Sequence, residues 1–428
     1  MSKHPIIFTF LFIILLIDVS IVMWWFLLRR PPPPPPRPEL PLPRITPLRV
    51  WAYGNEHQIR LWQSEINAFQ RSTRQPVSFT YWSRETEYLQ NRDTTLSPET
   101  SPDVFLTNSN EIERLYRNGR IRSFPFLASE STLWFAPALL PFRRGSEIIA
   151  YPSDFNTLML YYNKDHFDRI RTAYPDEKWS WDVLIAVSRA LERKDEHNRT
   201  QIWGIEYPLT YGFFQCLVNQ FAGAIFKDGR WIFGDPQVIS SQLLSLRFLI
   251  DLRYTHQTGF IRSPRLVPTQ FEQGRASMLI AGSEVLPALK KIKHLRWGVS
   301  PLPVMLRPGG YLEIYSWAVS AHTNNPRLAQ LLAQRLSRYG TREDRIPAYK
   351  VEDQLQTPEL RVFYLQAQRS ETAPIHPLTP DVQAMIQREL SILHQGKPID
   401  AHQILNRIKA QIITRPPPPK NTVAPAPF

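Results

Sequence analysis

The chain has very little cysteine: Cys216 is the only one in 428 residues. A single cysteine excludes an intrachain disulfide and any zinc site made of several thiolates. Cys216 stands among aromatic and aliphatic residues, namely Phe213, Phe214, Leu217 and Val218. Such surroundings are typical of a buried structural thiol, so we predict that Cys216 belongs to the core.

Motifs for nucleotide, metal and nucleophile chemistry are also missing. The chain has no G-x-G-x-x-G, G-x-x-x-x-G-K-[ST], H-E-x-x-H or G-x-S-x-G, and its ten histidines lack metal-ligand spacing. Tyr161 and Tyr162 could suggest iron ligation, but adjacent strand residues point to opposite faces, so at most one could reach a shared site. An enzyme hypothesis would therefore have no residue to rest on, and we predict no enzyme activity, no metal and no cofactor.

Blocks of five or more like charges do not occur, although the formal net charge is +13. A basic surface can bind nucleic acid or an anionic membrane. Because Lys and Arg are spread over many segments beside Asp and Glu, we favour a generally basic surface and predict no nucleic-acid partner. Salt-dependent retention on DNA would support the opposite hypothesis.

The one long hydrophobic run lies at the N-terminus, where residues 5–28 are interrupted by a single acid, Asp18. At about 1.5 Å per residue this run could cross a bilayer core of about 30 Å. Trp24 and Trp25 stand near its end, where interfacial aromatics are common. No A-x-A-like cleavage site follows, and Arg29, Arg30 and six prolines would suit a signal peptidase badly. We predict a short tail at 1–4 and an uncleaved transmembrane anchor at 5–28.

The 40 prolines cluster at both ends of the chain. Residues 29–47 have the composition of a polyproline II stalk, with a reach of about 50 Å at about 3.1 Å per residue. A Pro-rich ligand for a partner domain is the alternative interpretation. Residues 415–428 have a similar composition and are predicted to be a disordered tail.

Between these ends, short apolar runs alternate with helical patterns. Residues 48–53 are predicted to form a strand, and Ile59, Trp62, Ile66 and Phe69 then recur on one face of a helix. Alternation of this kind, continued to residue 414, predicts an α/β fold with mostly parallel sheets.

The stretch from Tyr151 to Trp181 gives the most specific indication. Its apolar run at 157–162 is typical of a strand buried on both faces. With several other segments it resembles the family 1 extracellular solute-binding proteins, the maltose-binding-like substrate-binding proteins of ABC importers. The segments that carry this resemblance are Val50-Trp51-Ala52-Tyr53-Gly54, Ser101-Pro102-Asp103-Val104-Phe105, Tyr162-Asn163-Lys164-Asp165 with Trp179-Ser180-Trp181, Phe271-Glu272-Gln273-Gly274-Arg275-Ala276-Ser277-Met278, Trp297-Gly298-Val299-Ser300-Pro301-Leu302-Pro303, Asp344-Arg345-Ile346-Pro347-Ala348 and the helix at 393–413.

The resemblance implies a two-lobed periplasmic-binding-protein-like fold (type II) over residues 48–414, with lobe crossings near 155, 315 and 345. It also implies hinge closure on a small solute, most simply a sugar, that is delivered to the permease subunits of an ABC importer. Export conflicts with the positive-inside rule, because Lys3 precedes the apolar run whereas Arg29, Arg30, Arg37 and Arg44 follow it. Since long domains often translocate regardless of flanking charge, we expect a single-pass cell-membrane protein with its large domain in the periplasm or outside the cell.

In open α/β sheets, ligands bind beyond the carboxyl ends of the strands and in clefts between lobes. The residues predicted to bind the ligand are Asn55, Glu56, Asn108, Asn110, Asn156, Tyr211, Phe213 and Glu284. Amide and carboxylate groups can bond hydroxyls, and an aromatic face can cover the apolar side of a sugar ring. Helix capping is the alternative role for Asn55, Asn108 and Asn110.

One turn departs from the family pattern. Where the family usually has an aromatic residue in a Gly-x-Trp turn, this chain reads Gly282-Ser283-Glu284. An acid in place of a stacking ring suits a more polar or cationic solute or an inactive cleft, and a solvated helix position is the structural alternative. A sensor that keeps the fold but signals through a membrane partner is the alternative function, which an adjacent kinase or receptor gene would favour.

Overall fold

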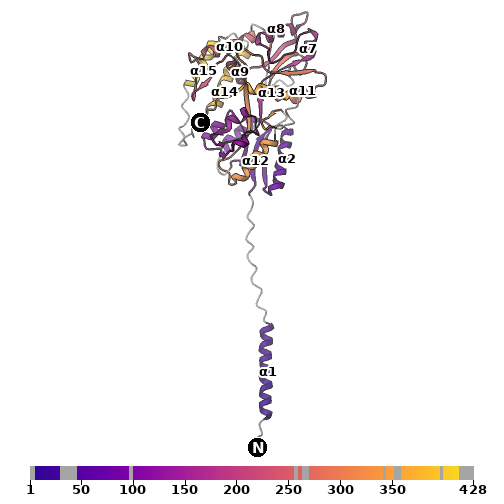
Figure 1. Ribbon diagram of the computed structural model, residues 1–428, viewed down its shortest axis with the longest axis vertical. Helices are drawn as coiled ribbons and strands as arrows, with labels where there is room; N and C mark the ends of the chain where they lie inside the picture. The colour runs from indigo at the N-terminus through magenta and orange to yellow at the C-terminus, as the bar shows by residue number, and fades with distance from the viewer. Residues whose placement is uncertain are drawn as a thin grey trace. The chain divides into compact units, whose positions relative to one another are not determined.

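The computed structural model describes residues 5–28, 46–95, 100–254, 259–262, 269–340, 344–350, 358–395 and 399–413. The chain divides into two compact units, Met1–Thr46 and Pro47–Phe428 (Figure 1). The predicted tails at 1–4 and 415–428, and all but the last two residues of the predicted stalk at 29–47, lie outside the described residues.

The first unit contains the helix α1, Pro5–Leu28, which coincides with the predicted apolar run. It has 24 residues, and its large apolar side chains between Ile13 and Leu27 are exposed. Across the described ranges, no helix reaches the combined length and hydropathy of a membrane-crossing segment.

The second unit is built on two large β-sheets. The first sheet has the order β17-β7-β16-β3-β1-β2, with β18 paired to β16. Its strands are β1 (Leu48–Tyr53), β2 (Val77–Trp82), β3 (Val104–Asn108), β7 (Tyr151–Thr157), β16 (Gly310–Val319), β17 (Ile346–Pro347) and β18 (Ser370–Thr372). We call the part of the chain built on this sheet the first lobe.

The second sheet has the order β13-β10-β14-β8-β15, with β9 paired to β10, and carries the second lobe. Its strands are β8 (Met159–Asn163), β9 (Arg193–Lys194), β10 (Thr200–Pro208), β13 (Gly259–Arg262), β14 (Ala276–Ala281) and β15 (Trp297–Ser300). Smaller pairings are formed by β4 (Phe124–Pro125), β5 (Arg143–Arg144) and β6 (Glu147–Ile148), and by the hairpin of β11 (Phe226–Lys227) and β12 (Arg230–Trp231).

Both sheets are mixed, so the prediction of mostly parallel sheets was wrong. β16 is antiparallel to β3 and β7, and β8 is antiparallel to β14 and β15. The cause is the passage of the chain between the sheets: β7 continues into β8 through the single residue Leu158. A strand that enters its sheet directly from the other lobe has no helical crossover to turn it parallel to its neighbours.

Helices cover both sheets. Figure 1 shows α2 and α12 at one end of the second unit and α8 and α10 at the other. The longer helices are α2 (Glu56–Thr73), α3 (Glu85–Thr95), α8 (Trp181–Leu191), α9 (Tyr211–Gln220), α10 (Ile239–Tyr254), α12 (Pro326–Tyr339), α13 (Pro358–Gln368), α14 (Thr379–Leu390) and α15 (Ala401–Ile413). The short ones are α4 (Ile112–Arg117), α5 (Ala128–Ser131), α6 (Ala136–Leu139), α7 (Lys164–Arg169) and α11 (Leu286–Lys291), with single 3₁₀ turns at η1 (Leu140–Phe142), η2 (Ser283–Val285) and η4 (Ser391–Gln395).

The core of the first lobe forms where α2 and α12 pack beside the sheet. Trp62, Ile66 and Phe69 of α2 are buried, as their helical spacing predicts. The Trp62 ring meets Trp317 of β16 edge-on at 5.4 Å, and its Nε1 donates to the Gly340 carbonyl at 2.7 Å. This indole hydrogen bond ties the first helix of the lobe to the end of α12.

The core of the second lobe centres on α8 and α9. Ser180 caps α8 by accepting a hydrogen bond from the Val183 N–H, and the buried Trp181 donates to Gln220 Oε1 at 2.8 Å. Cys216 on α9 is fully buried, which confirms its predicted place in the core. Burial raises the pKa of its thiol to about 12, so this cysteine is an unreactive core residue.

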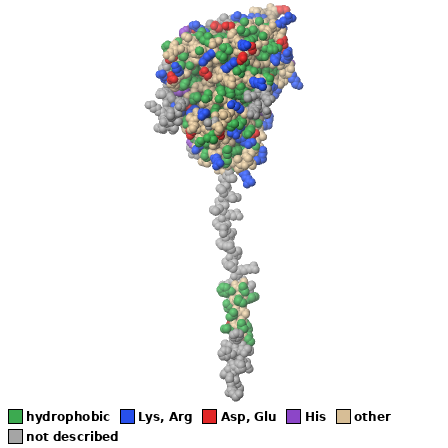
Figure 2. All heavy atoms as spheres, in the orientation of Figure 1, with side chains coloured by type: hydrophobic (Ala, Val, Ile, Leu, Met, Phe, Trp, Pro, Cys, Tyr) green, Lys and Arg blue, Asp and Glu red, His purple; other side chains and the backbone are tan. Residues whose placement is uncertain are grey.

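Positive charge is dispersed on the face of the molecule that Figure 2 shows. Lys and Arg side chains are scattered over this face, with Asp and Glu between them.

A buried ion pair joins α3 to the end of β3. Arg92 is fully buried, and its two terminal nitrogens each donate to a different oxygen of Glu111 at 2.6 Å. Thr107 donates a further bond to Glu111 at 2.8 Å. Burial acts to raise the pKa of Glu111, but the charge and hydrogen bonds of Arg92 hold this pKa below its usual value. The carboxylate is therefore ionised, and its negative charge compensates the positive charge of the buried guanidinium.

We expect Glu111→Gln to lower the free energy of unfolding by about 3 kcal/mol, because it removes the buried counter-charge of Arg92 and leaves only the half-exposed Asp93, at 2.8 Å, to compensate the guanidinium. Urea unfolding at neutral pH measures this loss. Glu87→Gln is the matched control, since Glu87 pairs with Arg84 at 3.0 Å on the surface and such pairs contribute about 0.5 kcal/mol or less. Equal losses in the two variants would contradict a structural role for the buried pair.

Candidate functional site

The candidate site is a cavity of about 290 Å³ to which both lobes contribute. Its wall comes from the β7–β8 crossing, the start of α9, the start of β16, one face of α14 and the loop after β3. The lining residues are Asn110, Asn156, Thr157, Leu158, Thr210, Tyr211, Gly212, Tyr311, Glu313, Gln383 and Gln387. Two larger hollows, of about 350 and 400 Å³, are lined by residues of the second lobe and its helices. We favour the smaller cavity because ligands of two-lobed α/β proteins bind where the lobes meet.

A chain of hydrogen bonds crosses this cavity from one lobe to the other. Gln383 of α14 donates to the Tyr311 hydroxyl at 3.2 Å, and that hydroxyl donates to Asn110 Oδ1 at 2.9 Å. The Asn110 amide donates in turn to Glu313 Oε1 at 3.1 Å. The Tyr315 hydroxyl donates to Glu313 Oε2 at 3.1 Å. The carboxylate of Glu313 thus accepts bonds from Asn110 and Tyr315.

Two tyrosine rings shape the wall, Tyr211 from α9 of the second lobe and Tyr311 from β16 of the first. Tyr211 and Tyr311 meet edge-on, with ring centroids 5.7 Å apart at 87°. The approach is close because Gly212 has no side chain: a Cβ there would lie 2.6 Å from the Tyr311 ring. Burial raises the pKa of both hydroxyls.

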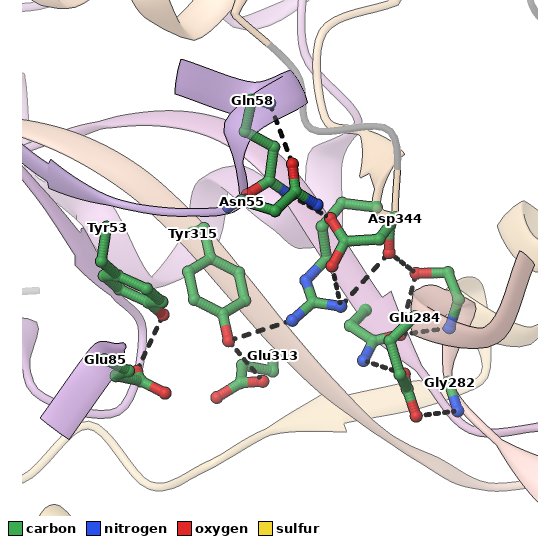
Figure 3. A network of polar contacts seen from close by, with 12 residues as sticks. Tyr53, Asn55, Gln58, Glu85, Gly282, Glu284, Glu313, Tyr315 and Asp344 are labelled. Carbon is green, nitrogen blue, oxygen red and sulfur yellow. Dashed lines mark hydrogen bonds and ion pairs between the residues drawn. The ribbon is translucent and has the colours of Figure 1, made fainter. Parts of the chain in front are cut away.

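Next to the cavity, a polar network fastens the turn after β14 to the first lobe (Figure 3). Asn156 Oδ1 accepts bonds from the Ser283 N–H at 2.7 Å and the Ser283 hydroxyl at 3.0 Å. The same hydroxyl donates to the Asp344 carbonyl at 2.7 Å. Asn156 Nδ2 donates to Glu284 Oε2 at 3.0 Å. These bonds connect β7, the Gly282-Ser283-Glu284 turn and the segment before β17.

Glu284 is an acid in an arginine environment. Its side chain is about one-third exposed and pairs with Arg262 at 3.0 Å. Burial acts to raise the pKa of Glu284, but the positive charges of Arg345 and Arg262 hold this pKa below its usual value. Of the roles considered for Glu284, the solvated helix position is excluded, because the carboxylate bonds Asn156 and Arg262.

Some residues that were predicted to bind the ligand do not line the cavity. Asn55 caps α2 by accepting a bond from the Gln58 N–H at 3.0 Å, and the exposed Glu56 pairs with Arg60 at 3.4 Å. Asn108 accepts from the Asn110 N–H at 3.0 Å and thereby shapes the turn after β3. Phe213 corrects the prediction: its fully buried ring packs on Trp181 and Tyr207 in the core of the second lobe, out of reach of a ligand.

Three predicted residues, Asn110, Asn156 and Tyr211, do line the cavity. Sequence reasoning missed several others: Tyr311, Glu313, Gln383 and Gln387. A signal for two of them was present. In β16, Leu312 and Ile314 are fully buried while Tyr311 and Glu313 alternate with them, which is the period-two pattern of a strand with one polar face.

Fold and site together define the class of protein: a two-lobed α/β protein with a polar cavity between its lobes. This architecture is typical of proteins that bind small solutes. Residues 66–338 match the bacterial extracellular solute-binding protein family. This chain belongs to that family, which confirms the resemblance and implies an extracytoplasmic location. The family consists of binding proteins, in line with the prediction of no enzyme activity.

Solved structures share the fold of this chain. An ABC substrate-binding protein of Listeria monocytogenes in complex with cycloalternan has a TM-score of 0.72 at 17% identity, covering 85% of this chain and 97% of its own. The maltotriose-binding protein of Thermus thermophilus, bound with maltotriose, has a TM-score of 0.67 at 19% identity, covering 85% and 100%. A cyclo/maltodextrin-binding protein complexed with maltotetraose has a TM-score of 0.66 at 18% identity, covering 86% and 98%. All three share the two-lobed architecture with this chain.

A further buried acid lies in the sheet of the second lobe. Glu206 of β10 is fully buried, accepts a bond from the Phe271 N–H at 2.9 Å and is near Arg262. Burial raises the pKa of Glu206 to about 7, against the opposing effect of the Phe271 N–H and Arg262. The folded protein therefore holds this proton more tightly than the unfolded chain does.

We expect this raised pKa to make stability fall as pH rises from about 4.5 to about 7, the interval between the unfolded and folded pKa values. Glu206→Gln should remove this pH dependence. The free energy of unfolding of the variant should then be higher than that of the parent by up to about 3 kcal/mol at pH 8, and by little at pH 4.5. Unfolding curves across this pH range test it, with Glu177→Gln, a half-exposed partner of Arg369, as the control. A pH-independent difference between variant and parent would contradict the assignment.

Proposed function

We propose that this protein captures a carbohydrate or a similar small polar solute in the cavity between its lobes and delivers it to an ABC importer. The observation that carries the proposal is the convergence of amides, a carboxylate and two tyrosine rings from both lobes on one cavity. Amides and carboxylates bond hydroxyls, and tyrosine faces cover the apolar side of a sugar ring. The bound cycloalternan, maltotriose and maltotetraose of the similar structures support the sugar class.

The cavity volume supports a short solute. About 290 Å³ lies at the lower limit of the usual range of about 300 to 1,000 Å³ for ligand sites. The network of Asn156, Ser283 and Glu284 occupies the neighbouring part of the lobe junction with the chain's own side chains. A solute of one or two sugar rings fits this space better than a long oligosaccharide does.

Hinge closure follows from how the chain passes between the lobes. Only Leu158 separates β7 from β8, so a change in backbone angles there would rotate one sheet against the other. A solute that contacts Asn110 and Glu313 from the first lobe and Gln383 from the second binds both sides only when the lobes are together. Such a ligand stabilises the closed arrangement by its differential affinity for it.

We further propose that α1 attaches the protein to the membrane and holds the body outside the cytoplasm. No described helix qualifies as a membrane-crossing segment. The proposal is supported by the apolar sequence of residues 5–28, with Asp18 as the single charge, and by the exposed apolar side chains from Ile13 to Leu27. Isolated apolar helices of this kind partition into lipid.

Solute binding is tested by thermal shift across a broad panel of sugars and polyols, using the full chain in a detergent without a sugar headgroup. We expect at least one compound to raise the melting temperature, since a ligand that binds only the folded state stabilises it. Asn110→Ala should lower the affinity for that compound about ten-fold, because it removes the partner of Tyr311 and Glu313.

The matched control for Asn110→Ala is Asn67→Ala, at an exposed position of α2 where Asn67 accepts a bond from Gln63. This variant should bind like the parent. No shift with any compound of the panel would count against the proposed function, and equal binding by the Asn110 variant would move the site elsewhere.

Membrane attachment is tested by fractionating cells that express the full chain, followed by alkaline carbonate extraction. We expect the full chain to stay with the membranes. A variant with Leu15→Arg and Val19→Arg should move to the soluble fraction, because arginine in the bilayer centre costs about 2.5 to 3.5 kcal/mol per residue. Release of the parent chain by carbonate would overturn the anchor.

A further inference from the structure

Beside the cavity, the turn Gly282-Ser283-Glu284 of the second lobe bonds two residues of the first lobe directly. Ser283 is fully buried, and its N–H donates to Asn156 Oδ1 at 2.7 Å. Its hydroxyl lies 3.0 Å from the same oxygen and 2.7 Å from the carbonyl oxygen of Asp344. Asn156 Nδ2 in turn donates to Glu284 Oε2 at 3.0 Å. We call Ser283, Glu284, Asn156 and Asp344 the latch, because each of these bonds joins one lobe to the other.

The half of the latch that comes from the second lobe is fixed within that lobe. Tyr161 of β8 donates to the Gly282 carbonyl at 2.9 Å, and Arg262 of β13 pairs with Glu284 Oε1 at 3.0 Å. The Gly282 N–H donates to the same carboxylate oxygen at 3.3 Å. Glu284 Oε2 is left to accept the bond from Asn156, and little further ordering of the turn is required to form that bond.

The half that comes from the first lobe is fixed in the same way. Gln58 of α2 donates to Asp344 Oδ1 at 2.6 Å (Figure 3). The strand β17, which follows Asp344, is antiparallel to β7, and β7 contains Asn156. Asn156 and Asp344 are therefore held by one sheet, and both present oxygen atoms to Ser283. The two halves meet as preformed surfaces, so that closing them costs little conformational entropy.

Glycine at position 282 allows the two halves to approach this closely. A Cβ at Gly282 would lie 2.3 Å from Asn156 Oδ1 and 2.3 Å from Glu284 Oε2. The φ of Gly282 is −81°, which other residues also adopt, so the close approach and not the backbone conformation requires glycine here. The fit between the halves of the latch is therefore steric as well as polar.

Opening of the lobes has to break the latch. A rotation at Leu158, between β7 and β8, carries the turn after β14 away from Asn156 and Asp344. Each hydrogen bond that is lost shifts the equilibrium about five-fold toward the closed arrangement, and the latch contains several. We propose that the latch holds the lobes together by itself, so that the closed arrangement predominates without any solute. This inference goes beyond the proposed function, because it concerns the chain alone and its test uses no solute.

Pulsed EPR distance measurements on the full chain test the latch. Spin labels are attached at one exposed position in each lobe, through Ser64→Cys on α2 and Ala190→Cys on α8. Cys216 stays unlabelled, because its thiol is buried and unreactive. We expect a single distance in the labelled parent after exhaustive dialysis, in a detergent without a sugar headgroup. Asn156→Ala and Gly282→Ala should each raise the ratio of open to closed molecules at least about ten-fold and add a second distance.

Asn325→Ala is the matched control. Asn325 is partly buried, like Asn156, but its oxygen accepts a bond from the Leu328 N–H inside the first lobe, so this variant should keep the single distance. Circular dichroism shows whether each variant is folded, and Ser283→Ala, which removes only a hydroxyl, takes the place of a variant that is not. Two distances in the dialysed parent, or the parent's single distance in the folded latch variants, would overturn the inference. The sugar panel decides the proposed function separately, since a protein that closes by itself can still bind a solute.

Discussion

The antiparallel pairing of β7 with β16 is the contact on which both the hinge and the cavity depend. Its register sets Asn156 opposite Glu313 and Thr157 opposite Leu312, and three of these four residues, all but Leu312, line the cavity. β7 continues through Leu158 into the second lobe, and the first residue of β16, Gly310, accepts a bond from Asn219 of α9. Because side chains alternate along a strand, a slip of one residue would turn Glu313 into the core and Leu312 toward the cavity. The register thus fixes the chemistry of the site.

The neighbouring network explains why Asn156 lines the cavity without being its main polar group. Its oxygen already accepts two bonds from Ser283, and its nitrogen already donates to Glu284. Few of its hydrogen-bonding positions remain for a solute. Asn156 therefore connects the two lobes, while the other side of the cavity contains Glu313 and the tyrosine pair.

Local patterns in the sequence predicted local structure well. The spacing of Trp62, Ile66 and Phe69 predicted the buried face of α2, and the crossing region gave Asn156 as a cavity residue. The prediction that Phe213 binds the ligand could have been avoided from the sequence. On a helix, positions two apart lie about 200° from each other, so Tyr211 and Phe213 cannot both face a ligand.

The features that could not be predicted from the sequence depend on long-range contacts. Gln383 and Gln387 reach the cavity from α14, far along the chain, and no local pattern reports which lobe a C-terminal helix will join. The direction of the strands also depends on contacts between distant parts of the chain. Short apolar runs predict strands, but whether neighbours are parallel depends on how the chain passes between the sheets, and here one residue replaces a helical crossover.

Glu284 is coupled to the two arginines beside it, Arg262 and Arg345. An aromatic ring there, as the family usually has, could cover a sugar, but it would leave Arg262 without its partner and remove one acid that Arg345 faces. Breaking such a partly buried pair costs more than the pair itself contributes, because the remaining charge loses its compensation. Glu284 and Arg262 therefore have to change together with Arg345, and the loss of the stacking ring is tied to a rebuilt, charged junction between the lobes. That junction has fixed charge in place of apolar stacking, and it lies beside the small polar cavity.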